Sequence, residues 1–316
     1  MFSTLLGALP VGPDDPVAAG DEPEAHLEDV AALCATGLEL ISDGGGPSIV
    51  TGDPSAVVTR WQTAANASAV PVKAVLLGPY STAHRAAKAA KAATASAERL
   101  RATTSAERLR ATIVALAEAG CPLVEIAEPD ATGIATDPAA AAAFTADHRR
   151  LVDGSEGIHA SLALPAANLE GTPPAVLFDL AYASYAFDLI GGPDNWRLIV
   201  QAPADRGIIV GALGLAERAD ETREVLVWAA HYAASTNGRG LARVGLANAP
   251  AAPGSPPPTR AQMLRKLAIV AEASRIAAVE EPGEMAALLD RRAVDARSAS
   301  GGRFAPARRR GGRAVR

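Results

Sequence analysis

Polar side chains able to do acid–base chemistry fall at or near the ends of short apolar runs. His159 lies in the run IHAS at 158–161, and its neutral imidazole could accept a proton or ligate a metal ion. Ser161 projects to the same side of an extended strand, because side chains alternate along it. Asp188 ends the next apolar run, so it could face His159 as its orienting partner or as a second metal ligand. Two structural roles stay open: His159 as a core histidine bonded to a carbonyl, and Asp188 as the cap of the turn at 191–193.

Two further acids occupy corresponding places. Glu128, before Pro129, ends a third run, where its carboxylate could bind a substrate ammonium group or cap a loop. Asp43 opens the segment DGGG, whose glycines allow positive φ and close approach of the backbone. That segment could cradle a phosphate, but without a following GK[ST] it indicates a tight turn between a strand and a helix. The expected site therefore has a catalytic pair and a substrate-binding set: His159 and Asp188, with Glu128, Ser161, Gly7 and Asp43.

Eight short apolar runs, rich in Val, Ile and Leu, must position these residues. The runs are near-continuous rather than alternating, which is typical of parallel strands covered on both faces. Stretches compatible with helices separate them. The expected strands lie near 3–8, 38–42, 72–77, 122–127, 157–163, 185–190, 207–212 and 241–246, and the expected helices at 24–35, 55–67, 80–119, 138–152, 173–182, 193–200, 217–235 and 260–275.

Eight strand–helix units within residues 1–290 match the size of a (β/α)8 barrel of the TIM type, folded as a single domain. Functional residues of such barrels lie at the carboxyl ends of the strands, where the residues above would converge. A doubly wound open sheet is the alternative fold. No GxGxxG motif follows the first run, which makes that alternative weaker.

Charge is unevenly distributed along the chain of 316 residues, whose net charge is −5. Residues 291–316 contain nine Arg and one Asp, a net charge of +8, which leaves −13 for residues 1–290. An acidic body argues against a nucleic-acid-binding groove, so we expect no specific nucleic acid partner. The tail has little apolar surface to bury. We expect it to be disordered and to contact polyanions only nonspecifically.

Composition narrows the class of protein further. Hydrophobic residues make up 49% of the chain and charged residues 21%, as in folded globular proteins. The longest apolar runs fall short of the roughly 20 residues that span a bilayer, and the first residues lack a cationic leader with a cleavage site. Cys34 and Cys121 cannot form a disulfide framework. We therefore expect a soluble, reduced, cytoplasmic protein with no membrane partner.

A nine-residue duplication lies in the third helical stretch, where SAERLRATT at 96–104 precedes SAERLRATI at 105–113. Nine residues make two and a half helical turns, so Leu100 and Leu109 face opposite sides of a continuous helix. We expect one copy to bulge out or to extend a solvent-facing arm, without a chemical role.

Taken in order, the strand ends resemble those of the catalytic barrel of cobalamin-independent methionine synthases, in the single-barrel form of that family. The resemblance extends over residues 1–290. The segments that carry it are LLGALP at 5–10, GLELISDG at 37–44, VKAVLLGPYSTA at 72–83, GCPLVEIAEPD at 120–130, IHAS at 158–161, YAFDLIGGPDNW at 185–196, IIVGALGLAERADETREV at 208–225 and GLARVGL at 240–246.

The resemblance implies a methyltransferase of methionine biosynthesis, which moves a methyl group from a folate or corrinoid donor to a thiol of the homocysteine type. Family members hold zinc with one His, two Cys and one Glu, and the zinc lowers the pKa of the bound substrate thiol. That assistance matters because a free thiol, with a pKa of about 8.5, is mostly protonated at neutral pH.

This sequence departs from the family's motifs at most of these positions. The His-x-Cys motif reads His159-Ala160-Ser161, Asp188 replaces the glutamate, and no cysteine occurs within 247–260. A hydroxyl is a poor zinc ligand beside a thiolate, so zinc is expected only in a site rebuilt around His159 and Asp188. Further replacements are Ala127-Glu128-Pro129 for Asp-Glu-Pro, Gly7-Ala8 for Gly-Ser, Gly45 for an acid and Ala216 for a histidine.

The sequence is compatible with three functions. The first is S-methyl transfer by a weakened or reconstructed site, and we place it first. The second is a non-catalytic barrel that binds a small molecule or a partner after losing the zinc site. The third is a different, metal-free reaction that uses His159, Asp188 and Glu128. Whether the chain is an enzyme at all is left open.

Overall fold

Seven strands form one parallel sheet in the order β1-β7-β6-β5-β4-β3-β2. The computed structural model describes residues 1–7, 9, 23–43, 54–89, 95–152, 158–215, 222–250 and 258–289. Strands β2 to β7 follow one another in chain order, and β1 pairs with β7 at the far edge. This cyclic order is that of an α/β barrel. A doubly wound sheet would need a point where the order reverses, so that alternative is excluded.

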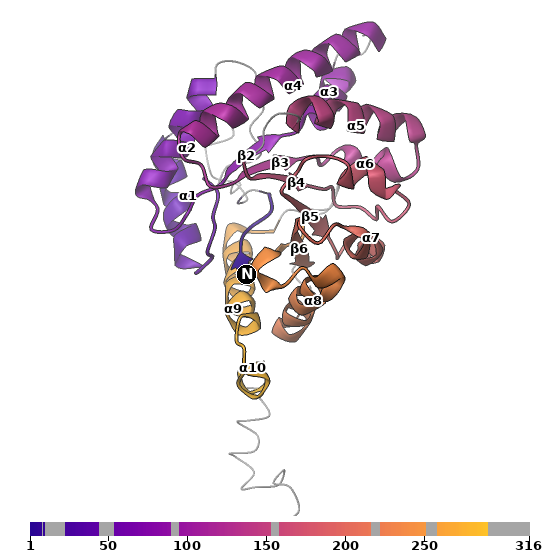
Figure 1. Cartoon of the computed structure of the whole chain (residues 1–316). Helices are drawn as coiled ribbons and strands as arrows, with labels where there is room; N and C mark the ends of the chain where they lie inside the picture. The colour runs from indigo at the N-terminus through magenta and orange to yellow at the C-terminus, as the bar shows by residue number, and fades with distance from the viewer. Residues whose placement is uncertain are drawn as a thin grey trace, which may run out of the picture.

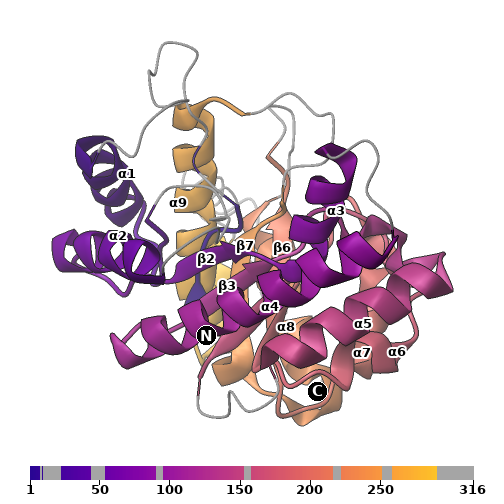
Figure 2. The same cartoon turned by 90° about the horizontal axis from the view of Figure 1, so that it is seen from above.

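Helices cover the outer face of the curved sheet, as Figures 1 and 2 show from two directions. The strands are β1 (Phe2–Ser3), β2 (Ala74–Leu77), β3 (Val124–Ala127), β4 (Ala160–Ala163), β5 (Ser184–Asp188), β6 (Gly207–Leu213) and β7 (Val244–Asn248). The α-helices are α1 (Pro23–Ala35), α2 (Pro54–Ala67), α3 (Pro79–Ala89), α4 (Ala95–Glu118), α5 (Pro138–Val152), α6 (Pro174–Phe178), α7 (Trp196–Gln201), α8 (Arg223–Ser235), α9 (Arg260–Ala277) and α10 (Pro282–Leu289). Single 3-10 turns are η2 (Ala131–Ala135), η3 (Pro193–Asn195), η4 (Thr236–Gly238) and η5 (Leu241–Arg243).

The strands are buried on both faces, as their near-continuous apolar runs predict. One large apolar cluster fills the space between the sheet and the helices. A second, smaller cluster lies on the concave side of the sheet and consists of Leu6, Val75, Ala127, Ala163, Ala186, Ile209 and Ala247. Four of those seven side chains are alanines, so the inner layer at this height is thin.

The expected strand at 38–42 is reduced to a single parallel bridge between Ile41 and Val72. Ser3 O accepts hydrogen bonds from Glu39 N at 3.2 Å and Leu40 N at 3.0 Å, so the segment lies between β1 and β2. The Ser3 N–H, however, donates to the carboxylate of Glu39 at 2.9 Å. A side chain thus takes the amide that a regular ladder would pair with a backbone carbonyl, and no longer strand forms there.

The long expected helix at 80–119 is instead two helices, α3 and α4. The duplicated segment lies in α4, which is continuous from Ala95 to Glu118, so neither copy bulges out. Leu109 of the second copy is buried against the core. Helix α10 was not expected from the sequence.

The Arg-rich tail at 291–316 lies outside the described residues, and so do Ala8, Gly45 and Ala216. Among the helices that the structure describes, none combines the length and the apolar character needed to cross a bilayer.

Candidate functional site

The carboxyl edge of the sheet carries three acids that the sequence singled out: Asp43, Glu128 and Asp188. Each follows or ends a strand-like segment, as expected, and each is almost fully buried. Every one of them already has partners within the chain, which decides what it can do at this edge.

Asp188 ends β5 and caps the turn that follows it. Its Oδ1 accepts hydrogen bonds from Ile190 N at 2.9 Å and Gly191 N at 3.0 Å, and its Oδ2 accepts from Gly191 N at 3.0 Å. Burial raises the pKa of the Asp188 carboxyl, and these two backbone donors partly offset that rise. The structural role left open by the sequence is therefore present in the molecule.

Glu128 follows β3 and caps helix α3 from a different strand. Its Oε1 accepts from Tyr80 N at 3.0 Å and its Oε2 from Ser81 N at 2.7 Å, so a carboxylate meets the positive end of the helix. Gly78 makes room for this contact, because a Cβ there would lie 2.1 Å from Glu128 Oε1. The loop-capping role is thus realised as a helix cap.

The same carboxylate touches a buried histidine that sequence reasoning missed. His148 Nε2 on α5 lies 3.0 Å from Glu128 Oε1, and His148 Nδ1 is 2.6 Å from the hydroxyl of Tyr182. All three side chains are fully buried. Burial, followed by the negative charge of Glu128, raises the pKa of Tyr182 well above its ordinary value, so its hydroxyl keeps its proton.

Asp43 forms an ion pair with Arg60 on α2, at 2.6 Å between Oδ2 and Nε. The side chain of Arg60 is about one-quarter exposed (27%), whereas that of Asp43 is 6% exposed. Gly7, at the end of the first run, has φ +85 and open space where a Cβ would point. Asp43 and Gly7, both expected to bind substrate, therefore lie at the carboxyl edge of the sheet.

His159 is at the opposite edge of the sheet. The residue is exposed and immediately precedes β4. Its Nε2 lies 3.1 Å from the Oγ of Ser184, which is the first residue of β5. Asp188 is four residues further along β5, roughly 13 Å away at about 3.3 Å per residue. The expectation that His159 and Asp188 face each other is therefore wrong, because the strand starts after the histidine rather than before it.

Removing the His159 imidazole should consequently do little. We expect His159→Ala to change the free energy of unfolding by less than about 1 kcal/mol, since one exposed neutral hydrogen bond is lost. Ligand affinity at the carboxyl edge should be unchanged. Thermal unfolding and ligand titration check both points, and a large loss of affinity with an intact fold would contradict this placement.

Ser161 lies inside the curved sheet with a buried ion pair. It is the register partner of Glu125 on β3, whose carboxylate contacts the ammonium group of Lys73. Lys73 Nζ also donates to Leu5 O at 2.5 Å. Both charged side chains are 1% exposed, and each lies two residues before an inner-cluster residue, Lys73 before Val75 and Glu125 before Ala127, so both point inward. Within the described chain, Ser161 Oγ and Glu125 Oε1 have no hydrogen-bond partner.

The described residues do not fit the zinc site that the family resemblance implies. Both cysteines of the chain lie toward the amino edge: Cys34 Sγ is 3.4 Å from Ser68 Oγ, and Cys121 Sγ donates to Leu123 O at 3.2 Å. At the carboxyl end of β4, Ala163, Leu164 and Pro165 offer no ligand atoms on their side chains. Over the described ranges, no three His, Cys, Asp or Glu side chains are grouped to hold a metal ion.

The thiol of Cys121 is also held in its protonated form, whereas a metal ion binds the thiolate. Burial raises its pKa to about 11, despite contacts with the backbone of Ala74 and Leu123 that act the other way. We expect iodoacetamide at pH 8 to label Cys121 roughly 200-fold more slowly than a free thiol of pKa about 8.5, because the thiolate is the nucleophile. Intact-mass kinetics measure this, with the urea-unfolded chain as the control. Equal rates in the two states would refute it.

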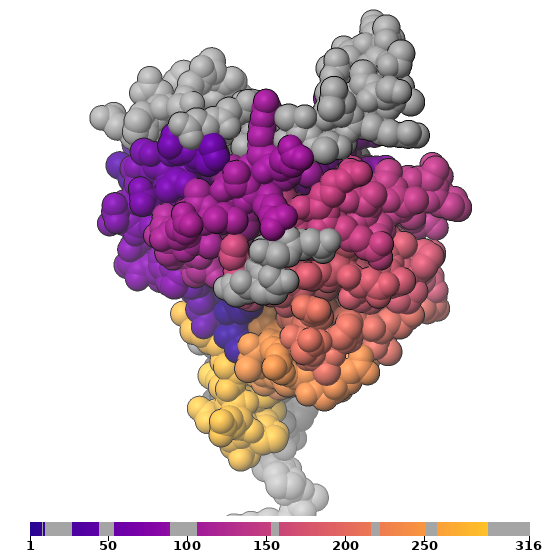
Figure 3. All heavy atoms as spheres, turned by 45° about the horizontal axis from the view of Figure 1, so that its top comes forward, coloured from indigo at the N-terminus to yellow at the C-terminus, as the bar shows by residue number. Residues whose placement is uncertain are grey.

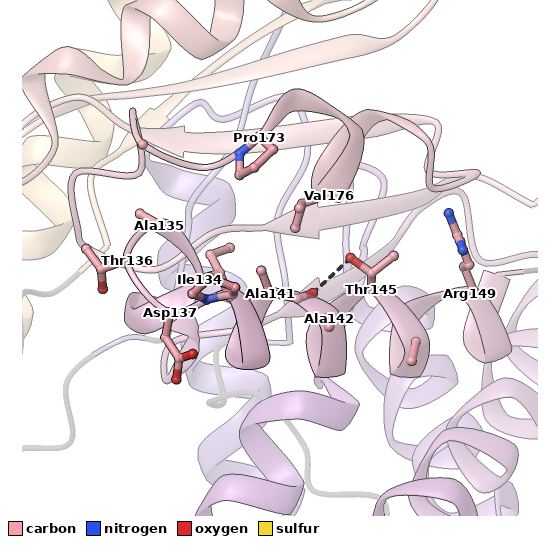
Figure 4. A pocket seen from close by; sticks show the side chains of 13 residues that line it. Ile134, Ala135, Thr136, Asp137, Ala141, Ala142, Thr145, Arg149, Pro173 and Val176 are labelled. Atoms are coloured by element: carbon pink, nitrogen blue, oxygen red, sulfur yellow. Dashed lines mark hydrogen bonds between the residues drawn. The ribbon is translucent and has the colours of Figure 1, made fainter.

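A cavity of about 560 Å³ lies on the outer wall, between α5 and the segment leading into α6. Figure 4 shows its mostly apolar lining, with Asp137 toward one end and Arg149 toward the other. Asp137 Oδ1 accepts from Ala139 N at 2.8 Å and so caps α5. None of the residues predicted for the site lines this cavity.

No protein-family model and no curated protein matches this chain. Solved structures do match it. A B12-independent methionine synthase from Shewanella sp. W3-18-1 superposes with a TM-score of 0.65 at 14% identity, over 86% of this chain and 97% of that one. A methyltransferase from Methanosarcina mazei gives 0.57 at 13% identity, over 86% and 91%. A xylose isomerase-like TIM barrel protein from Mycobacterium smegmatis gives 0.51 at 12%, over 88% and 97%. At such identities the likeness concerns the fold, and it shows that this chain is an α/β barrel of the same general architecture.

Proposed function

We propose that this chain is a methyltransferase-like barrel, distantly related to the B12-independent methionine synthases, that methylates a small-molecule thiol of the homocysteine type. The observation that carries the proposal is the superposition on the Shewanella enzyme, which spans nearly the whole of both chains. The residue pattern at the strand ends runs in the same order as in that family. We also propose that the segment at 38–42 completes the ring of eight.

Substrates would bind at the carboxyl edge, above the thin inner layer of alanines. There the sulfur lone pair forms the new S–C bond while the bond from the methyl group to the donor nitrogen of a methylfolate breaks. The thiol proton ends on that nitrogen. Asp188, Glu128 and Asp43 act as positioning residues, because each holds a loop or a helix start at this edge.

The metal requirement is the main difference that we propose from the family. Thiolate ligation of zinc needs a cysteine at the carboxyl edge, and both cysteines lie toward the other edge. Methyl transfer by this chain should therefore survive chelation, whereas a cysteine-ligated zinc enzyme would lose activity.

The test uses the purified full chain with homocysteine and a deuterated methyl donor, either methyltetrahydrofolate or methylcobalamin. We expect labelled methionine above the protein-free rate, with and without EDTA. Ala163→Leu, which fills the inner layer under the carboxyl edge, should abolish product, and the His159→Ala variant serves as the matched control. Thermal unfolding of both variants reports whether they fold. No labelled product with either donor would overturn the proposal.

A further inference from the structure

An aromatic patch covers neighbouring faces of α7 and α8, which lie beside each other in Figure 1. Trp196 packs against Trp228 and Tyr232, with ring centroids 5.4 and 4.9 Å apart, and Trp228 stacks on Tyr232 at 5.3 Å. Trp228 is 56% exposed, and Val225 and Val200 extend the patch as exposed apolar side chains. We define the patch as these five residues: Trp196, Val200, Val225, Trp228 and Tyr232.

Most of this patch lies outside the barrel's core, and only Trp196 packs against it as well. Helix α8 buries its inner face through Leu226, Val227 and Ala230, while Val225, Trp228 and Tyr232 follow one another along its outer face. The chain has only twelve aromatic residues, 4% of the total, yet three of them gather here. Exposed clusters of Trp and Tyr are typical of interaction surfaces.

We propose that this patch binds the chain's own Arg-rich segment, residues 291–316. A guanidinium group is planar and stacks on the faces of Trp and Tyr, and the segment carries nine of them. The composition of this segment suits an aromatic surface, because it has nine arginines, a single acid and few apolar side chains.

The path of the chain allows this contact. Helices α8 and α9 are packed together, and α10 packs on α9. Both α8 and α9 run from the carboxyl edge of the sheet to its amino edge, so Tyr232 in the last turn of α8 is near the edge from which α10 leaves. Figure 3 shows α10, in yellow, projecting at that end of the molecule. Twenty-six residues extended at about 3.3 Å each would reach far beyond α8.

Charge favours the same occupant. Residues 1–290 carry a net charge of −13 and the segment a net charge of +8. The two acids nearest the patch in sequence already pair with arginines of the body, Asp194 with Arg197 at 3.5 Å and Asp205 with Arg206 at 3.9 Å, so the attraction comes from the net charge of the body as a whole. Attraction between the two raises the local concentration of arginines over the aromatic rings.

Tethering makes weak contacts sufficient. A segment on the same chain presents its groups at an effective concentration on the order of millimolar. Each arginine–aromatic contact need only have a dissociation constant in that range for the patch to be occupied about half the time. Several arginines sharing the patch raise the occupancy further.

The test is 19F NMR of the full chain labelled with 5-fluorotryptophan, which gives three signals, from Trp61, Trp196 and Trp228. Trp61 is an internal control, because it is buried and its indole N–H donates to Val72 O at 2.8 Å. In the variant R308Q/R309Q/R310Q/R313Q we expect the signals of Trp228 and Trp196 to shift and that of Trp61 to stay. High salt should move the same two signals in the same direction, because it screens the attraction.

The matched control is R149Q/R150Q, which removes two adjacent arginines from the exposed face of α5, and no tryptophan signal should move. Shifts that do not depend on protein concentration identify the chain's own segment. The proposal is overturned if the tail substitutions leave Trp196 and Trp228 unchanged. It is equally overturned if those signals depend on concentration and still do so in the tail variant, which would assign the patch to a second copy of the chain.

Discussion

Substituting Lys73 by methionine is expected to lower the free energy of unfolding by about 3–5 kcal/mol, the usual cost of leaving one member of a buried ion pair alone. Lys73 and Glu125 are each 1% exposed and lie inside the sheet, so water cannot take over the lost contact. The free Glu125 carboxylate would also lose its neighbour while its second oxygen is already unpartnered within the described chain. Urea unfolding of the wild type and the variant measures the difference.

The double variant Lys73→Met/Glu125→Leu separates burial from attraction. Replacing a whole buried ion pair by apolar groups of similar volume is often neutral or stabilising, so most of the lost stability should return. A double variant as unstable as Lys73→Met alone would show that the damage comes from packing rather than from the stranded charge.

Replacing Glu128 by alanine is expected to cost roughly 3 kcal/mol or more of stability. The carboxylate accepts two backbone hydrogen bonds at the start of α3, and charge-assisted bonds contribute about 1.5–3 kcal/mol each. His148 would lose its acidic neighbour as well. Glu128→Gln keeps the shape and one acceptor oxygen, so it should fall between the wild type and Glu128→Ala in thermal unfolding.

Glu118→Gln is the control, because that side chain is exposed at the end of α4 and should change stability by less than about 0.5 kcal/mol. Ligand affinity separates the two roles predicted for Glu128, substrate binding and capping. A helix cap predicts that the well-folded Glu128→Gln variant keeps its affinity at low temperature. A large loss of affinity without a loss of stability would instead favour direct contact with substrate.

The sheet was predictable because its strands are buried on both faces and read as continuous apolar runs. Six of the expected strands appear within a few residues of their runs. The exceptions have local causes. The run at 38–42 yields only a bridge because the carboxylate of Glu39 takes the amide of Ser3. The run at 3–8 yields only Phe2–Ser3 as a regular strand, and further on the side chain of Asn248, rather than a backbone group, bonds the amide of Leu6.

The site was harder to predict because the strands are short, so an error of a few residues in where a strand begins places a side chain at the wrong edge of the sheet. The run around IHAS suggests a strand that includes His159, yet β4 begins at Ala160. The pair of His148 and Tyr182 left no motif, since the two residues are 34 positions apart in different kinds of element. The pair of Lys73 and Glu125 did leave a signal: one charge inside each of the apolar runs VKAVLL and LVEIA.

The junction of β1 with β7 sets a condition on biosynthesis. Phe2 pairs with Gly245, and both the amide and the carbonyl of Leu6 bond to the side chain of Asn248, 242 positions later. A nascent chain leaving the ribosome therefore exposes the edge of its first strand until nearly all the remaining strands have been made. Contacts this distant in sequence form slowly, and an unpaired edge invites association with other chains. Chaperone binding during translation would therefore be concentrated on the earliest strand of this barrel.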